Sequence, residues 1–186
     1  MRRKDREMDA DFGLYIIDKS RYTTISVVDE VGAPYSIPIS TTRIGNKIYM
    51  HSAMGGRKVE LFTPDKDVCM VFVSDVQVPE LYTRAELEEM AVDESKSSLL
   101  ARRVFTTEFG SAVVKGKINL VQDTDERVEA FTALCAKFCP DKAYLVDAAI
   151  RAGGSHAFIY GVDIIELTAK RKKYDEEGHE IKGNKK

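Results

Sequence analysis

The sequence predicts an α+β domain built on an antiparallel split β-barrel with flanking helices. Short β-branched or alternating segments, separated by turns, fill the first half of the chain, and two helices and a final strand follow. We find no internal repeat and no linker between domains. The expected organisation is one domain, residues 1–170, followed by a charged C-terminal tail, residues 171–186.

Composition narrows the functional classes. The chain has 186 residues, 44% hydrophobic and 31% charged, with a formal net charge of −2 and a pI near 6.0. One sizeable core is expected, and a general nucleic-acid binder, which would be basic, is disfavoured. No apolar run approaches the ~20 residues of a membrane helix, and no signal-peptide pattern follows the basic start. Three cysteines without framework spacing favour a reducing compartment, so a cytoplasmic location is expected.

The first half of the chain reads as a helix followed by a β-meander. Residues 9–20 have helical spacing, with Asp9 or Asp11 available as a cap. Strands are expected at residues 23–28 and 34–42, and at residues 47–50, ending at His51. Pro38 cannot donate to a ladder, so it belongs at an edge, at a bulge, or beside something that is not a strand. A flat ligand and an ordinary barrel edge both satisfy that requirement.

The second half alternates between the two periodicities. Residues 68–73 are apolar on both faces and predict a central strand. Thr83 and Glu86 form a capping-box pattern that opens a helix with Leu87 and Met90 on its buried face. The remaining expected elements are strands at 104–107, 111–121 and 157–167, with a bulge at Gly116, and helices at 123–138, capped by Asp123, and 144–152.

The most distinctive stretch is residues 51–58, which join a strand to a short helix through Gly55 and Gly56. Arg57 and Lys58 occupy the first helical turn, where each cation costs about 0.3–1 kcal/mol at an exposed site. A bound anion there would reverse the sign, because free N–H groups and both cations would face it. The alternative is a surface turn with two solvated cations.

Several segments together resemble the FMN-binding split-barrel family related to pyridoxamine 5'-phosphate oxidase, and most closely its nitroimidazole-resistance branch. The resemblance covers most of residues 1–170. The segments that carry it are Met1–Glu7, Asp29–Pro38, Tyr49–Lys58, Ser111–Lys117 and Glu166–Lys170.

This resemblance implies a homodimer with one FMN per subunit at the interface. Arg57 and Lys58 would bind the phosphate, with Ser52 as a further donor. The flavin ring would meet the backbone of Pro38, Ile39, Ser40 and Thr41, and Ser111 would reach it from the opposite side of the site. The alternative for Ser111 is an ordinary strand serine.

His51 is the candidate catalytic residue, because an imidazole can give or take a proton near neutrality. Its alternative is a packing or hydrogen-bonding role within the pocket. Cys135 and Cys139 share a helix face but have no further ligands nearby, so buried thiols are favoured over a metal site, and no metal is expected.

Three features separate this chain from the family pattern. The Arg-containing substrate segment of the true oxidase is absent, which disfavours vitamin B6 oxidation. Residues 79–103 are longer than a hairpin and could be a lid or a dimer contact. The chain has no tryptophan, so Tyr49, Phe72 or Phe109 would have to stack on the flavin.

The leading functional hypothesis is therefore an FMN-dependent oxidoreductase acting on small molecules, including nitro groups, with NAD(P)H or a partner protein as reductant. The alternatives are a protein that stores or senses FMN or haem without turnover, a pyridoxal-phosphate carrier, and a pyridoxamine phosphate oxidase-type activity.

Overall fold

The computed structural model describes residues 2–183, apart from the side chain of Ser97, and it is organised around one antiparallel sheet. Met1 and residues 184–186 of the expected tail lie outside the described residues. The strands are β1 (Glu7–Met8), β2 (Thr23–Val28), β3 (Pro34–Ile39), β4 (Thr42–Ile44), β5 (Lys47–Ala53), β6 (Lys66–Gln77), β7 (Glu108–Leu120) and β8 (Ala157–Lys172).

Six α-helices accompany these strands in the described part of the chain. They are α1 (Ala10–Lys19), α2 (Arg57–Leu61), α3 (Arg84–Val92), α4 (Ser97–Leu99), α5 (Thr124–Phe138) and α6 (Val146–Gly153). Short 3-10 segments lie at Lys4–Arg6, Glu94–Lys96, Pro140–Leu145 and Gly154–His156, and a π-helical turn at Leu100–Val104. No helix among the described residues is long and apolar enough to cross a membrane.

The sheet curls back on itself without closing. Its order is β3-β2-β6-β7-β8-β5-β4, with β1 added to β8. The two edge strands are consecutive in sequence, because only Ser40 and Thr41 separate the end of β3 from the start of β4. Three Cα–Cα steps span at most about 11 Å, so the edges come close at that point although they are not paired. The α+β class and the antiparallel sheet are confirmed, whereas a closed barrel is not observed.

Most expected elements are present, with shifted ends. Helix α1 begins after its cap Asp9, whose side chain accepts a hydrogen bond from the Phe12 amide. The bulge at Gly116 is confirmed by the register shift between β7 and β8. Three expectations need correction. The strand expected at 34–42 is divided into β3 and β4, the final strand continues to Lys172, and residues 104–107 are not a strand.

The core lies inside the curl, between α1 and the strands. Fully buried side chains from α1 and five strands meet there, including Ile16, Ile25, Met50, Phe72, Val114 and Val162. Residues 68–73 form part of the central strand β6, as expected, but only one of its two apolar faces is buried. Alternate side chains enter the core, while Val71 and Val73 remain exposed. One face of that strand is therefore apolar without being covered by this chain.

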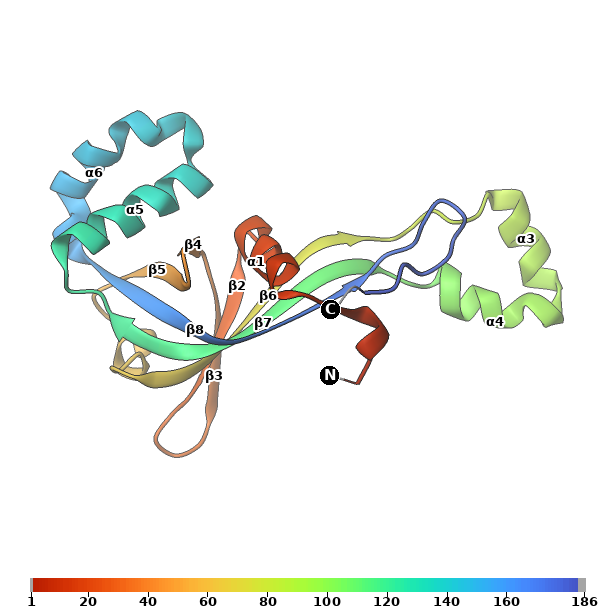
Figure 1. Cartoon of the computed structure of the whole chain (residues 1–186), viewed down its shortest axis with the longest axis horizontal. Coiled ribbons are helices and arrows are strands. Elements are labelled where there is room, and N and C mark those ends of the chain that lie inside the picture. Colours follow the sequence, from red (N-terminus) through yellow and green to blue (C-terminus); the bar gives the residue numbers. More distant parts are fainter. Residues whose placement is uncertain (1, 184–186) are drawn as a thin grey trace.

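Two projections extend from opposite ends of the sheet (Figure 1). At one end, α5 packs on β4 and β5, and α6 packs against α5. At the other end, β6 and β7 continue outward and carry α3 and α4; we call residues 78–107 the arm. The expected capping box of Thr83 and Glu86 is confirmed in α3, but no residue of α3 is buried. Leu87 and Met90, expected on a buried face, are only half-buried.

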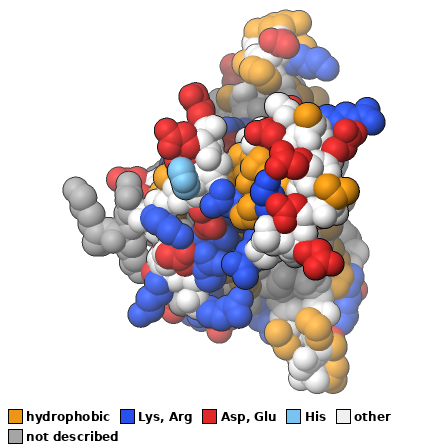
Figure 2. Space-filling view, turned by 90° about the vertical axis from the view of Figure 1, so that its right-hand side faces the viewer, with side chains coloured by type: hydrophobic (Ala, Val, Ile, Leu, Met, Phe, Trp, Pro, Cys, Tyr) orange, Lys and Arg blue, Asp and Glu red, His pale blue; other side chains and the backbone are white. Residues whose placement is uncertain are grey.

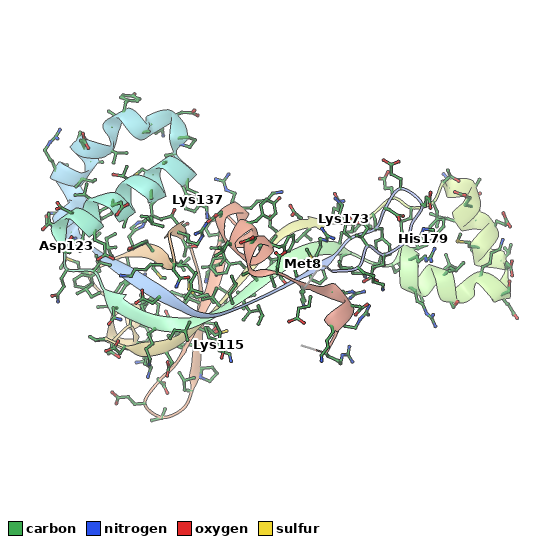
Figure 3. The ribbon with its side chains drawn as sticks, in the orientation of Figure 1. Met8, Lys115, Asp123, Lys137, Lys173 and His179 are labelled. Carbon is green, nitrogen blue, oxygen red and sulfur yellow. The ribbon has the colours of Figure 1, made fainter. Side chains whose placement is uncertain are left out.

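The two termini meet near the middle of the molecule. Arg6 forms an ion pair with Glu180, and the Gly183 amide donates to the carbonyl of Asp5. Tyr174 and Glu180 form an isolated bridge that closes a turn. The described part of the C-terminal segment is therefore attached to the N-terminal segment, and Figure 3 shows His179 and Lys173 within it.

Gly116 offers a test of this topology, because a Cβ there would lie 2.2 Å from the carbonyl oxygen of Asp163. Backbone atoms cannot yield as a flexible side chain can, so Gly116→Ala should destabilise the fold by about 2 kcal/mol. Gly153→Ala is the matched control, since nothing lies within 4 Å of its Cβ position, and it should change stability by less than about 0.5 kcal/mol. Urea unfolding measures both, and equal effects would contradict the β7–β8 register.

Candidate functional site: a pocket at His51

The strand, glycine turn and short helix expected around residues 51–58 are present as β5, Met54–Gly56 and α2. Gly56 has φ +96°, a conformation that L side chains rarely adopt, and nothing lies within 4 Å of a Cβ at Gly55 or Gly56. The turn is thus open on its outer side. Its backbone could come close to a ligand.

The two cations of this turn differ in their surroundings. Arg57 contacts Asp29 at 3.1 Å and Glu60 at 3.2 Å, so its charge is already balanced by carboxylates. Lys58 is half-buried and forms no ion pair within the described residues. An anion at this turn would find Lys58 available and would have to displace carboxylates from Arg57.

His51 lies on β5 and lines a pocket with a volume of about 500 Å³. The His51 ring is 6.2 Å from that of Phe131. Burial lowers the pKa of His51, and the positive charge of Lys58 lowers it further. The pocket is lined by Arg21, Tyr22, Ser40, His51, Phe131, Leu134, Cys135, Phe138, Cys139, Ala149, Ile150, Gly153 and Gly154. It is therefore largely apolar, with few polar groups.

Helix α5 forms one wall of this pocket, and hydrogen bonds at both of its ends fix its position. Asp123 caps it by accepting from the Glu126 amide. The Glu126 carboxylate accepts from Lys47 at 2.9 Å and from the Tyr49 hydroxyl at 2.8 Å, and these hydrogen bonds lower the pKa of Glu126. At the other end, Lys137 donates to the carbonyl of Ile17, and Figure 3 shows it beside α1. The helix is thus tied to β5 and to α1.

The segment Pro38–Thr41 reaches the pocket only in part. Ser40 lines it, whereas Pro38 and Ile39 lie in the edge strand β3, where the missing N–H of proline costs no ladder bond. Thr41 is 1% exposed, and its hydroxyl is buried without a hydrogen-bond partner. Ser52 is also buried and donates to the carbonyl of Ala53.

Ser111 lies far from His51 in the same chain. Both residues pair with strand β8. His51 pairs with Ile159, whereas Ser111 pairs with Lys170, which lies eleven residues further along β8. At about 3.3 Å per strand residue the two positions are separated by roughly 35 Å along β8. A single small ligand cannot touch both residues of one chain.

Several pocket residues were not identified from the sequence. Phe131 supplies the ring nearest His51, whereas Tyr49 and Phe72 are buried in the core and Phe109 lines a different pocket. Cys135 is half-buried and Cys139 exposed, so the expectation of buried thiols is only partly met. No group of three or more potential metal ligands occurs among the described residues. The helical spacing of residues 123–138 indicated a packing face, but not the face that borders His51.

Comparison with known proteins supports the predicted resemblance. Residues 13–83 match the family model described as pyridoxamine 5'-phosphate oxidase. That match includes β2 to β6 and the glycine turn, and it ends within the arm at Thr83, the cap of α3. No curated protein shows significant sequence similarity to the chain.

Solved structures resemble the chain over most of its length. A putative 5-nitroimidazole antibiotic resistance protein from Bacteroides thetaiotaomicron has a TM-score of 0.61 at 17% identity, covering 88% of this chain and 84% of that one. The FAD and heme binding protein from Mycobacterium smegmatis has a TM-score of 0.67 at 15% identity, covering 96% and 82%. The flavocytochrome Anf3 from Azotobacter vinelandii has a TM-score of 0.61 at 17% identity, covering 96% and 79%. These likenesses show a shared split-barrel-type fold.

The proximity of Lys58 to His51 gives a direct test of the pocket. Replacing Lys58 by methionine removes a charge that disfavours the imidazolium, so the pKa of His51 should rise. It should stay below that of an exposed histidine, because burial is the larger cause. NMR titration of the His51 ring protons measures the shift. Lys115→Met, which removes a cation on β7, is the control and should leave the titration unchanged; an equal shift in both variants would contradict the geometry.

Proposed function

We propose that this chain, which resembles the pyridoxamine 5'-phosphate oxidase family in residues 13–83 and in fold, is a flavoprotein. We further propose FMN as the flavin and small-molecule oxidation–reduction as the activity. The observation that carries the proposal is the apolar pocket at His51, from which the chain continues into the open glycine turn and Lys58, whose charge acts on the His51 ring.

The residues present fit a flavin. A pocket of 500 Å³ with aromatic and aliphatic walls suits a flat ring, and its few polar groups would orient the ring edge. Thr41 is buried outside the pocket, so Ser40 is the residue of this segment that could meet the polar ring edge. Lys58 would neutralise the phosphate, and Arg57 would join it by exchanging Asp29 and Glu60 for phosphate oxygens.

We propose that a second copy of the chain completes the site. Ser111 and the arm lie at the opposite end of the sheet from His51, so neither can reach the pocket of its own chain. A two-fold arrangement with antiparallel copies would bring both to the partner's pocket. The arm supports this: none of α3 is buried, and Val78, Val92 and Phe105 are 66%, 85% and 82% exposed. Figure 2, which views the molecule from this end, shows apolar side chains among acidic ones.

A bound flavin supplies the electron transfer, and the protein supplies orientation and proton transfer. Because burial and Lys58 lower the pKa of His51, the imidazole is neutral near pH 7 and has one nitrogen free to accept a proton. Phe131 and the apolar wall border the ring on one side, and the ring remains accessible to a substrate. His51 is thus placed to hold or move a proton at a small substrate, including one with a nitro group.

A second candidate function is storage or sensing of haem. An accessible histidine facing an apolar pocket is also what a haem iron would need as an axial ligand. Among the proteins with this fold are one that binds FAD and heme and a heme storage protein, HutZ from Vibrio cholerae, with a TM-score of 0.53 at 10% identity.

The deciding experiment is an absorbance spectrum of the purified protein before and after anaerobic addition of NADH and of NADPH. Flavin bands that bleach would support a flavin oxidoreductase, and chromatography of the released cofactor would distinguish FMN from FAD. Persistent flavin bands would favour a binding protein or another electron donor. A Soret band on adding haem, with no flavin uptake, would favour the second candidate.

The cationic turn predicts a loss of cofactor in a double variant. Replacing Arg57 and Lys58 by alanine should weaken FMN binding at least 100-fold, since each charge-assisted contact contributes about 1.5–3 kcal/mol. Flavin fluorescence titration measures the affinity, and size-exclusion chromatography should show an unchanged assembly. The control is Lys115 and Lys142 replaced together. Unchanged flavin occupancy in the Arg57 and Lys58 variant would refute the phosphate assignment.

The proposed proton role of His51 predicts a separation of binding from turnover. His51→Ala should retain the flavin but slow substrate reduction by about 100-fold, as expected when a general acid or base is lost. Stopped-flow absorbance of the flavin measures the rate, and His156→Ala is the matched control. An unchanged rate of reduction would show that His51 only lines the pocket. Loss of haem binding with an unchanged rate would support a role for His51 as the haem ligand.

A further inference from the structure

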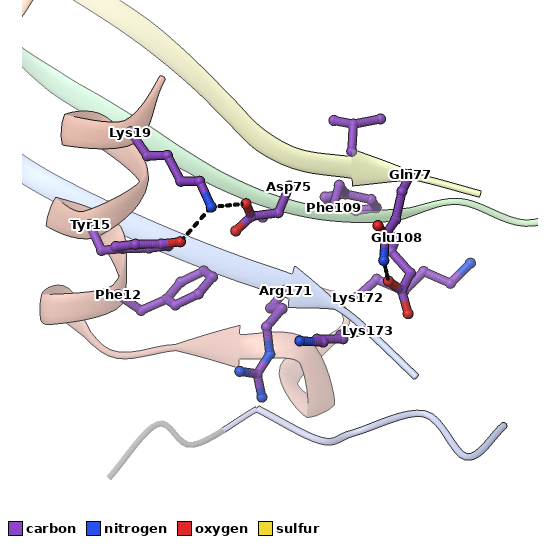
Figure 4. Close-up of a pocket in the computed structure, with 12 residues that line it drawn as sticks. Phe12, Tyr15, Lys19, Asp75, Gln77, Glu108, Phe109, Arg171, Lys172 and Lys173 are labelled. Carbon is purple, nitrogen blue, oxygen red and sulfur yellow. Dashed lines mark hydrogen bonds and ion pairs between the residues drawn. The ribbon is translucent and has the colours of Figure 1, made fainter. Parts of the chain in front are cut away.

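A second pocket, of about 440 Å³, lies at the end of the sheet opposite His51 (Figure 4). It is formed by one face of α1 and by the outer parts of β6, β7 and β8. Its lining residues are Phe12, Tyr15, Lys19, Asp75, Val76, Gln77, Glu108, Phe109, Gly110, Arg171, Lys172 and Lys173. The flavin proposal uses none of them.

The pocket carries an excess of positive charge. Four cations and two acids line it, which leaves a net charge of +2. Both acids are already engaged. Asp75 pairs with Lys19 at 2.5 Å, and Glu108 accepts from the side chain of Gln77 and from the Tyr174 amide. Neither acid forms an ion pair with Arg171 or Lys173.

Arg171 is the residue with unmet bonding capacity. Its guanidinium carbon lies 5.8 Å from the ring centre of Phe12, so the group is held over an aromatic face. Its Nε is buried and finds no hydrogen-bond partner among the described residues. The rest of the planar guanidinium lines the pocket, where it can donate to the oxygens of an anion.

The backbone supports the same arrangement. β6 carries a bulge between Ser74 and Gln77, and Asp75 within it has φ +56°, a strained value for a residue other than glycine. At this irregularity Asp75 points toward Lys19, and Lys19 also donates a hydrogen bond to the Tyr15 hydroxyl at 2.7 Å (Figure 4). Lys19 and Asp75 thereby neutralise each other at one side of the pocket and leave the Arg171 side cationic.

We infer that this pocket is a second ligand site, which binds a small anion carrying a flat aromatic group. Arg171 and Lys173 would hold the carboxylate or phosphate, because guanidinium and ammonium groups are the usual partners of such oxygens. Phe12, Tyr15 and Phe109 would contact the ring. Within one chain the site is separate from the His51 pocket, and it differs from that pocket in chemistry, since the His51 pocket is mainly apolar.

The test is isothermal titration of the purified protein at low ionic strength with phenyl phosphate and benzoate. Inorganic phosphate serves as an anion without a ring, and benzamide as a ring without a charge. At least one aromatic anion should bind at least tenfold more tightly than phosphate and benzamide. Its affinity should fall as salt is added. No detectable binding of either aromatic anion would overturn the inference.

Arg171→Gln should weaken binding of the aromatic anion at least tenfold, and Lys173→Gln, an exposed change that cannot disturb the core, should weaken it at least threefold. Arg84→Gln is the matched control, because Arg84 is a surface arginine on the arm, and it should leave the affinity unchanged. Flavin absorbance is measured in every variant. Wild-type affinity in both Arg171 and Lys173 variants would overturn the site, and so would parallel loss of flavin on Arg171→Gln, which would make the pocket part of the flavin site.

Discussion

The long antiparallel pairing of β7 with β8 is the constraint on which the rest of the structure depends. The ladder runs from Phe109 with Lys172 to Leu120 with Tyr160. β8 also pairs with β5 at one end and with β1 at the other, so a single strand carries both His51's neighbour and Arg171. Because a paired strand cannot shift by one residue without exchanging its two faces, this register fixes which side chains enter each pocket.

The fold was predictable where local signals agree with the final contacts. Caps at Asp9, Thr83 and Asp123, and the bulge at Gly116, were read from residue type and spacing, because they depend on near neighbours in the chain. The open curl was not predictable. It depends on whether β3 and β4 pair with each other, and the sequence of neither strand determines this by itself.

The candidate sites show the same division. The glycine turn and its two cations could be identified because they are contiguous, and the family resemblance gave them a role. Phe131 could not be assigned, since an apolar helix position looks the same whether it meets the core or lines a pocket. The excess charge near Arg171 was also hidden, because four elements distant in sequence contribute it. Residues 170–186 read only as a charged tail.

The pockets at the two ends of the sheet differ in the charge that they present to a ligand. At the His51 end, Glu126 is occupied by Lys47 and Tyr49, so no charge from that network enters the apolar pocket. At the Arg171 end, Asp75 and Glu108 are occupied by Lys19, Gln77 and Tyr174, which leaves cations in excess. In both places, therefore, hydrogen bonds made by carboxylates decide which charges a ligand would meet. Replacing Glu108, which lines the second pocket, would thus raise that pocket's positive charge without removing Arg171 or Lys173, the proposed partners of the anion.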